Sequence, residues 1–177
     1  MKYALIYGLL SGGVIAGTIT AGLALGPENS LFSSVWFGYL VMLVALSFVF
    51  MGVKRYRDVE KGGVIRFMPA LGMGLGIAAV AALGYILVWE IYLAATDYRF
   101  MDEFLAATQS GLEAQGKSAA EVASEMAQYD WMRENYGNPL IRIPVTFVEI
   151  FPVGLIVALF SAAVLRNPRV LPARATG

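Results

Sequence analysis

The sequence contains neither cysteine nor histidine. Without cysteine the chain has no disulfide, no thiol nucleophile and no thiolate ligand for an iron–sulfur cluster. Without histidine it lacks the commonest metal ligand and the commonest general base. We therefore expect no cofactor, no metal and no enzymatic activity. The enzyme alternative would require carboxylates paired around a metal ion.

Charge is also scarce. Charged residues make up 15% of the chain and apolar residues 58%, and the mean hydropathy is +0.66. These values are too apolar for an ordinary soluble domain. The formal net charge is zero, so the composition carries no basic excess typical of a nucleic-acid-binding protein. The composition predicts an integral membrane protein with membrane lipid as its first partner.

Long apolar runs then divide the chain. A membrane-spanning helix needs about 20 predominantly apolar residues. Four runs satisfy this length, at about 3–25, 31–53, 67–95 and 140–165. Gly26-Pro27-Glu28-Asn29 forms a turn between the first two runs, which makes them an antiparallel hairpin. The predicted fold is an all-α membrane protein, a single membrane domain over 1–177 with four transmembrane helices.

A polar stretch at 96–138 separates the last two runs and predicts a two-helix extramembrane cap. Met101 and Leu105 belong to an apolar stripe with helical spacing. Gly116 ends that helix, and Ser118 and Glu121 have the spacing of a capping box at the start of a second helix. We expect this insertion on the periplasmic side.

Basic residues are distributed unevenly between the two predicted sides of the membrane. Five of them lie in the segment 54–66, between the second and third runs: Lys54, Arg55, Arg57, Lys61 and Arg66. With Lys2 and the C-terminal arginines, nine basic residues fall on that side and four on the other. Basic segments are retained in the cytoplasm, so both termini are expected there.

Small residues recur at a spacing of four. Gly8–Gly12 and Gly13–Gly17 form such pairs in the first run, and similar spacings recur in the third. One line in the third run consists of Ala70, Gly74, Ala78 and Ala82, and another consists of Gly72 and Gly76. Such faces allow helix backbones to approach closely. We expect the third-run face to pack against the first run, within one chain or across a homo-oligomer.

The segment 54–66 also carries a family resemblance. The residues Gly52-Val-Lys-Arg-Tyr-Arg-Asp58, Gly62-Gly63-Val-Ile-Arg-Phe67 and Leu112-Glu-Ala-Gln-Gly-Lys-Ser-Ala-Ala-Glu121 resemble the small bacterial four-span membrane proteins grouped as the domain of unknown function DUF4199. The resemblance implies a bacterial inner-membrane protein with four spans. It implies no activity and no catalytic residue.

Glu149 is the first candidate for a functional residue. It lies about nine residues into the last run, ~14 Å below the outer edge of the membrane. Pro144 and Pro152 flank it and free the carbonyls of Leu140 and Val148. A carboxylate at this depth is a functional hypothesis by default. The alternative is a protonated Glu149 that bonds a neighbouring helix and holds the bundle or a dimer together.

Glu90 and Arg142 are expected at similar depths near the outer ends of two runs. An ion pair between them would reduce the cost of burying both charges, and Arg142 and Glu149 share a helix face. The three residues are thus a candidate intramembrane polar site, with Trp89 and Tyr92 at its mouth. The alternative is that Glu90 and Arg142 extend to the membrane surface.

The five basic residues of 54–66 have two interpretations. They are candidate ligands of anionic lipid head groups, or they set the topology and do nothing more. Within the segment, Arg57 and Asp58 are expected to form a solvent-exposed pair, which contributes little to stability. Taken together, the sequence favours a non-enzymatic structural or accessory protein of the inner membrane. The second hypothesis is a small transporter or lipid-handling protein that uses the intramembrane carboxylates.

Overall fold

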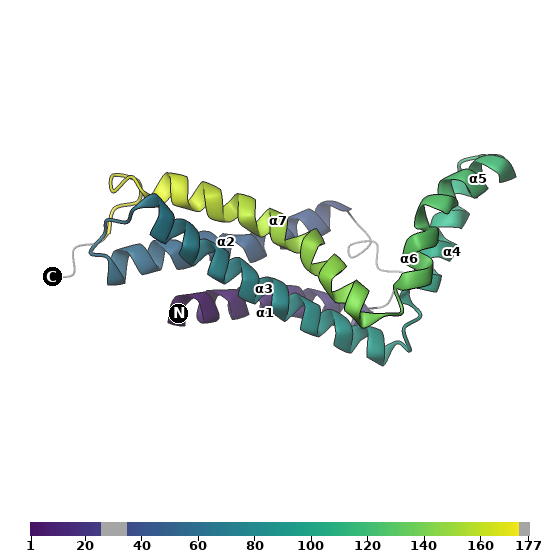
Figure 1. The fold of residues 1–177 in the computed structure, drawn as a ribbon, viewed down its shortest axis with the longest axis horizontal. Coiled ribbons are helices and arrows are strands. Elements are labelled where there is room, and N and C mark those ends of the chain that lie inside the picture. The colour runs from purple at the N-terminus through teal and green to yellow at the C-terminus, as the bar shows by residue number, and fades with distance from the viewer. Residues whose placement is uncertain (26–34, 174–177) are drawn as a thin grey trace. The chain divides into compact units, whose positions relative to one another are not determined.

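The structure is a computed structural model that describes residues 1–25 and 35–173 (Figure 1). The predicted turn at Gly26–Asn29 lies outside the described residues. The elements are α1 (Lys2–Leu25), α2 (Val35–Glu60), α3 (Phe67–Ala95), α4 (Phe100–Ala114), α5 (Ala119–Met126), the 3-10 helix η1 (Ala127–Tyr129), α6 (Asp130–Asn135) and α7 (Pro139–Leu165). The described part of the chain contains no strand, which confirms the all-α prediction.

Within the described ranges 1–25 and 35–173, three helices are long and apolar enough to cross a membrane. They cover Lys2–Gly22, Phe67–Ala95 and Pro139–Leu165. The run predicted at 31–53 begins among residues that the structure does not describe, and α2 covers its remainder as a helix of 26 residues. The fourth span therefore stays a prediction.

The chain folds into two compact units. The first comprises Met1–Ile86 and Phe147–Gly177, and the second comprises Leu87–Thr146. Helices α3 and α7 contribute residues to both units, and each unit is described by itself below. The second unit contains the whole of the predicted insertion at 96–138 together with the adjoining turns of α3 and α7.

The core of the first unit lies between α2, α3 and α7. Val49 and Val53 of α2, Ile77 of α3 and Ala158 and Leu165 of α7 are fully buried in one cluster. Small side chains bring the backbones of these helices close together, so the core is thin and tightly packed.

The small residues of α3 divide between two neighbouring helices. A Cβ atom on Gly74 would lie 2.8 Å from Cβ of Ala158 in α7, whereas one on Gly76 would lie 3.4 Å from Cβ of Ala4 in α1. The third run therefore packs against the first, as expected, through Gly76, but the expectation was wrong for the line through Gly74 and Ala78, which faces α7. Ala78 instead contacts the position of Gly154 in α7, because residues four apart share a face and Gly76 lies on a different one.

Helices α1 and α2 form an antiparallel pair. The Ser11 hydroxyl of α1 donates a buried hydrogen bond of 2.8 Å to the carbonyl of Ala45 in α2. Nearer the start of α1, the Tyr3 hydroxyl donates to Glu60 at the end of α2 over 3.1 Å. The pairing of early with late residues confirms the hairpin. It also places the start of the chain beside the segment 54–66.

The second unit follows much of its predicted local structure. Met101 and Leu105 are buried on α4, as the stripe indicates. Gly116 has a φ of +77° just after α4 ends. The Ser118 side chain accepts from the Glu121 amide, and the Glu121 carboxylate accepts from the Ser118 amide over 2.8 Å. Both the helix stop and the capping box are confirmed.

Candidate functional site

The segment 54–66, interpreted from sequence as a basic loop, is helical over its first half. Helix α2 continues through Glu60, so Lys54, Arg55 and Arg57 lie on its last two turns. The chain turns at Gly62 and Gly63, whose φ angles are +61° and +86°. These left-handed values suit glycine, so the predicted helix stop is confirmed while the loop begins seven residues later than expected.

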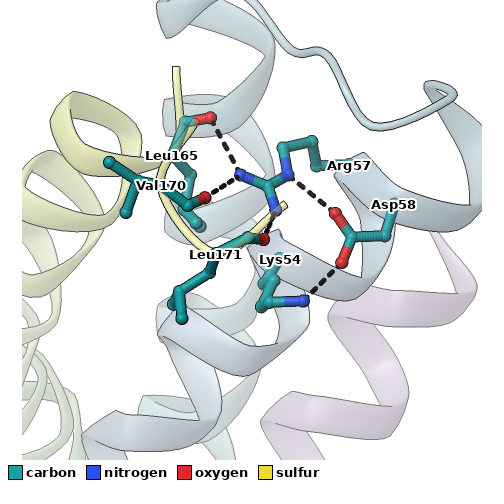
Figure 2. Close-up of polar contacts among 6 residues, drawn as sticks. All are labelled: Lys54, Arg57, Asp58, Leu165, Val170 and Leu171. Atoms are coloured by element: carbon teal, nitrogen blue, oxygen red, sulfur yellow. Dashed lines mark hydrogen bonds and ion pairs between the residues drawn. The ribbon is translucent and has the colours of Figure 1, made fainter. Parts of the chain in front are cut away.

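Among the described residues of the first unit, Arg57 is the most buried charged residue, with an exposed fraction of 0%. Figure 2 shows its guanidinium pointing into a group of backbone carbonyls at and beyond the end of α7. It donates to the carbonyl of Val170 over 3.0 Å, to that of Leu171, and more weakly to that of Leu165 over 3.5 Å. The carbonyl of Leu165, the last residue of α7, has no partner within its own helix, so Arg57 supplies a donor to this helix end as well as to the two carbonyls beyond it.

A carboxylate completes this arrangement. Asp58 accepts from Nε of Arg57 over 2.7 Å and also from Lys54 one turn earlier. Burial alone would raise the pKa of Asp58, but the hydrogen bonds from Lys54 and Arg57 outweigh it and hold that pKa below its usual range. We call Lys54, Arg57, Asp58 and the carbonyls of Leu165, Val170 and Leu171 the Arg57 clamp.

The backbone beyond α7 is adapted to the Arg57 clamp. Leu171 has a φ of +48°, a conformation unfavourable for a residue with a branched side chain. Residues are held in such conformations where surrounding contacts compensate the strain, and here the carbonyl of Leu171 accepts from Arg57. The segment then returns to the turn after α2, where a Cβ atom on Gly63 would lie 3.2 Å from Cβ of Ala173.

Sequence reasoning predicted an Arg57–Asp58 pair but took it to be solvent-exposed, and that was wrong. A signal was present in the helical spacing. Arg57 follows Val49 and Val53 at intervals of four residues, so it lies on the same face of α2 as these two core residues. Both valines and Arg57 are fully buried. Arg57 is therefore not available as a ligand of a lipid head group in this structure.

The other basic residues of the segment are more accessible. Lys54 is half-buried and Arg55 and Arg66 are exposed. Lys61 lies over the ring of Tyr56, with its ammonium 5.5 Å from the ring centre. A role of these four residues in binding head groups stays a prediction.

In the second unit, Glu90 and Arg142 form the predicted ion pair. Arg142 of α7 is 2% exposed. Its Nε and one terminal nitrogen donate to the two carboxylate oxygens of Glu90 in α3, over 2.8 and 2.6 Å. This two-pronged geometry is the strongest form of such a pair.

The remaining contacts of Arg142 come from tyrosines. Its third nitrogen donates to the carbonyl of Tyr136 over 2.6 Å. The guanidinium carbon lies 5.3 and 5.6 Å from the ring centres of Tyr98 and Tyr136, distances at which a cation is attracted to a ring face. Trp89, expected beside this site, donates to the hydroxyl of Tyr136 over 2.9 Å. We call Arg142, Glu90, Tyr98 and Tyr136 the Arg142 clamp.

Glu149 lies on α7 with an exposed side chain. It belongs to the first unit, whereas Glu90 and Arg142 belong to the second. A common cleft of the three residues therefore stays a prediction. Helix α7 runs without interruption over Pro144 and Pro152. Tyr92, the other aromatic residue expected at the mouth, packs 5.1 Å from Trp89 between ring centres.

The family model of DUF4199, described as a protein of unknown function, matches residues 2–167. No curated protein matches, and no solved structure matches. Among the described residues, no group of three Asp or Glu side chains could hold a metal ion.

Proposed function

Since the chain belongs to the DUF4199 family, whose description names no activity, we propose that it is a non-enzymatic structural or accessory membrane protein. The proposal places it in a bacterial inner membrane with four spans and both termini in the cytoplasm. The excess of basic residues in and around 54–66 supports this orientation. The family resemblance of the sequence supports the compartment.

The observation that carries the proposal is that, among the described residues, every guanidinium nitrogen of the buried Arg57 and Arg142 donates within the protein. Each of the three guanidinium nitrogens of Arg142 donates to an acceptor within the second unit. Each of those of Arg57 does so within the first. A buried cation that binds a substrate needs donors directed at that substrate, whereas these donors are directed at the protein itself. The guanidinium groups of Arg57 and Arg142 therefore stabilise the fold of their own units.

Association with a second copy is part of the proposal. A Cβ atom on Gly13 or on Gly17 would meet no described atom within 4 Å, so this pair is free for close approach by another helix. In lipid nanodiscs we expect the protein to associate and Gly13→Leu to weaken that association. Gly72→Leu, at an equally open position on α3, is the matched control. Equal association of all three forms would exclude Gly13 from the contact, and a natural protein that stays monomeric would remove homo-oligomerisation from the proposal.

The exposed carboxylate of Glu149 favours the second candidate, a small transporter or lipid-handling protein. Helix α7 is apolar enough to span a membrane, and an ionisable side chain within such a span is expensive unless it is paired, protonated or hydrated. A carrier that couples transport to protons would use Glu149 in this way.

Proton flux distinguishes the two candidates. The full chain is reconstituted in liposomes that contain a pH-sensitive dye, alongside Glu149→Gln and the control Glu134→Gln, the same change at an exposed position of α6. The accessory role predicts no flux above empty liposomes for any form and unchanged thermal stability of Glu149→Gln. Flux in the natural protein and in Glu134→Gln that disappears in Glu149→Gln would overturn the accessory role and support a carrier.

A further inference from the structure

A pocket lies beside the Arg57 clamp, between the last turns of α2 and the segment that follows α7. Its volume is about 600 Å³, within the range of pockets that hold small ligands. It is lined by Lys54, Arg55, Asp58, Val59, Leu171, Pro172 and Ala173. The segment 171–173 that forms one wall is held by the bonds of Arg57 to Val170 and Leu171.

The charges around this pocket favour an anion. Asp58 is the one carboxylate among the described residues of the lining, and it is already paired with both Lys54 and Arg57. The ammonium of lysine has three donors, so Lys54 retains donors after its bond to Asp58. Arg55 is exposed and forms no ion pair with residues 1–25 or 35–173. The pocket is thus lined by two basic side chains, Lys54 and Arg55, and the negative charge of Asp58 is already compensated by its ion pairs with Lys54 and Arg57.

The other lining residues are apolar. Val59 and Leu171 are more than half exposed, and Pro172 and Ala173 continue the same wall. The pocket therefore combines cationic donors with a surface that accepts hydrocarbon. Helix α2 passes from an apolar stretch into the basic residues at this point, which is where a membrane-spanning helix would reach the head-group layer.

We propose that this pocket binds a phosphate group, in the first place the phosphodiester of an anionic phospholipid, through the guanidinium of Arg55 and the ammonium of Lys54. Guanidinium groups bind phosphate with two parallel hydrogen bonds, and lysine acts on it as a point charge. Arg57 and Asp58 are positioning residues in this site, because they hold the wall and set the direction of Lys54. The inference does not depend on the accessory role proposed above.

The test uses the full chain in detergent, titrated with phosphatidylglycerol and followed by native mass spectrometry, which counts bound lipids. Arg55→Gln removes a pocket charge that makes no internal ion pair, and Arg66→Gln removes the same charge from an exposed position outside the pocket lining. We expect Arg55→Gln to weaken retention of the first lipid roughly tenfold, because the variant loses a charge-assisted hydrogen bond to the phosphate. Arg66→Gln should change it by less than about twofold.

A second variant separates the pocket from general surface charge. Val59→Phe keeps every charge and fills the pocket from its exposed wall, and we expect it to weaken phosphatidylglycerol retention as well. Phosphatidylcholine and inorganic phosphate serve as further probes. Inorganic phosphate that binds with the same dependence on Arg55 and displaces the lipid would support a phosphate site whose natural ligand is soluble. Equal losses in Arg55→Gln and Arg66→Gln, or no retention of either anion, would overturn the proposal.

Discussion

Each buried arginine of this protein has a different kind of acceptor. Two nitrogens of Arg142 donate to the carboxylate of Glu90, so the positive charge of Arg142 is paired with one negative charge. Arg57 bonds to backbone carbonyls and one carboxylate that it shares with Lys54. The first arrangement depends on a partner side chain that mutation can remove. The second depends on the path of the backbone, which a side-chain substitution elsewhere leaves in place.

The Arg142 clamp predicts strong coupling between its two charged members. Arg142→Met leaves the carboxylate of Glu90 without its partner, and we expect a loss of about 3 kcal/mol in the free energy of unfolding. The double variant with Glu90→Leu removes both charges, and we expect it to recover most of that loss. Denaturant unfolding of the four forms in detergent gives the coupling energy. Losses that simply add would show that the pair contributes no specific stability.

The Arg57 clamp predicts sensitivity to acid. Asp58 has a pKa held below its usual range, so its contribution to stability is complete above the unfolded value of about 3.9 and is lost as the pH falls through the lower folded value. Below about pH 4 the melting temperature of the natural protein should fall more steeply with pH than that of Asp58→Asn. The comparison requires melting curves of both forms across this range. Parallel slopes would mean that Asp58 does not titrate with unfolding.

At the scale of elements, close approach between helices decides which glycines are required. On α3, Gly74 meets α7 while Gly72 meets open space. Both lie in the same helix two residues apart, so they have the same intrinsic helix propensity. The difference between them comes from the neighbouring helix alone.

This pair predicts opposite effects of the same substitution. Gly74→Ala places a methyl group 2.8 Å from Cβ of Ala158, and we expect it to destabilise the protein by about 1–3 kcal/mol. Gly72→Ala adds a methyl group in open space and should be neutral or stabilising by up to about 1 kcal/mol. Denaturant unfolding in detergent measures both. Equal effects would indicate that α3 and α7 separate enough to accommodate the added methyl group.

At the scale of the whole molecule, the absence of cysteine makes the topology directly measurable. Lys61→Cys and Ser110→Cys each introduce a single thiol at an exposed position. The excess of basic residues near Lys61 predicts that it faces the cytoplasm. We therefore expect a membrane-impermeant maleimide to label Ser110→Cys in intact cells and Lys61→Cys only after lysis. The reverse pattern would invert the proposed orientation.

Much of the fold could be predicted from the sequence because its signals are local. The bounds of α3 and α7, the stop at Gly116 and the capping box at Ser118 depend on hydropathy, glycine and residue spacing within one segment. The Glu90–Arg142 pair could also be predicted, because an ion pair between two opposite charges at similar depth reduces the cost of burying both of them.

Other features depend on distant parts of the chain and could not be predicted in this way. Gly74 packs against α7 rather than α1 because of how three helices are arranged. Arg57 bonds to residues that follow α7, and no local pattern shows that the backbone there turns back toward α2. The positive φ of Leu171 is a consequence of that path. It could not be predicted from the sequence, because leucine, unlike glycine, does not indicate a left-handed conformation.

The Arg57 clamp also has a consequence for biosynthesis. Two of the carbonyls that accept from Arg57, those of Val170 and Leu171, lie 113 and 114 positions later in the chain, so they are synthesised long after Arg57. While the ribosome is still translating α3 to α7, the carbonyls of Val170 and Leu171 do not yet exist, so the clamp can close only after α7 has been synthesised. A chain that stops short of Val170 would leave two nitrogens of Arg57 without these acceptors on the face of α2 that carries Val49 and Val53.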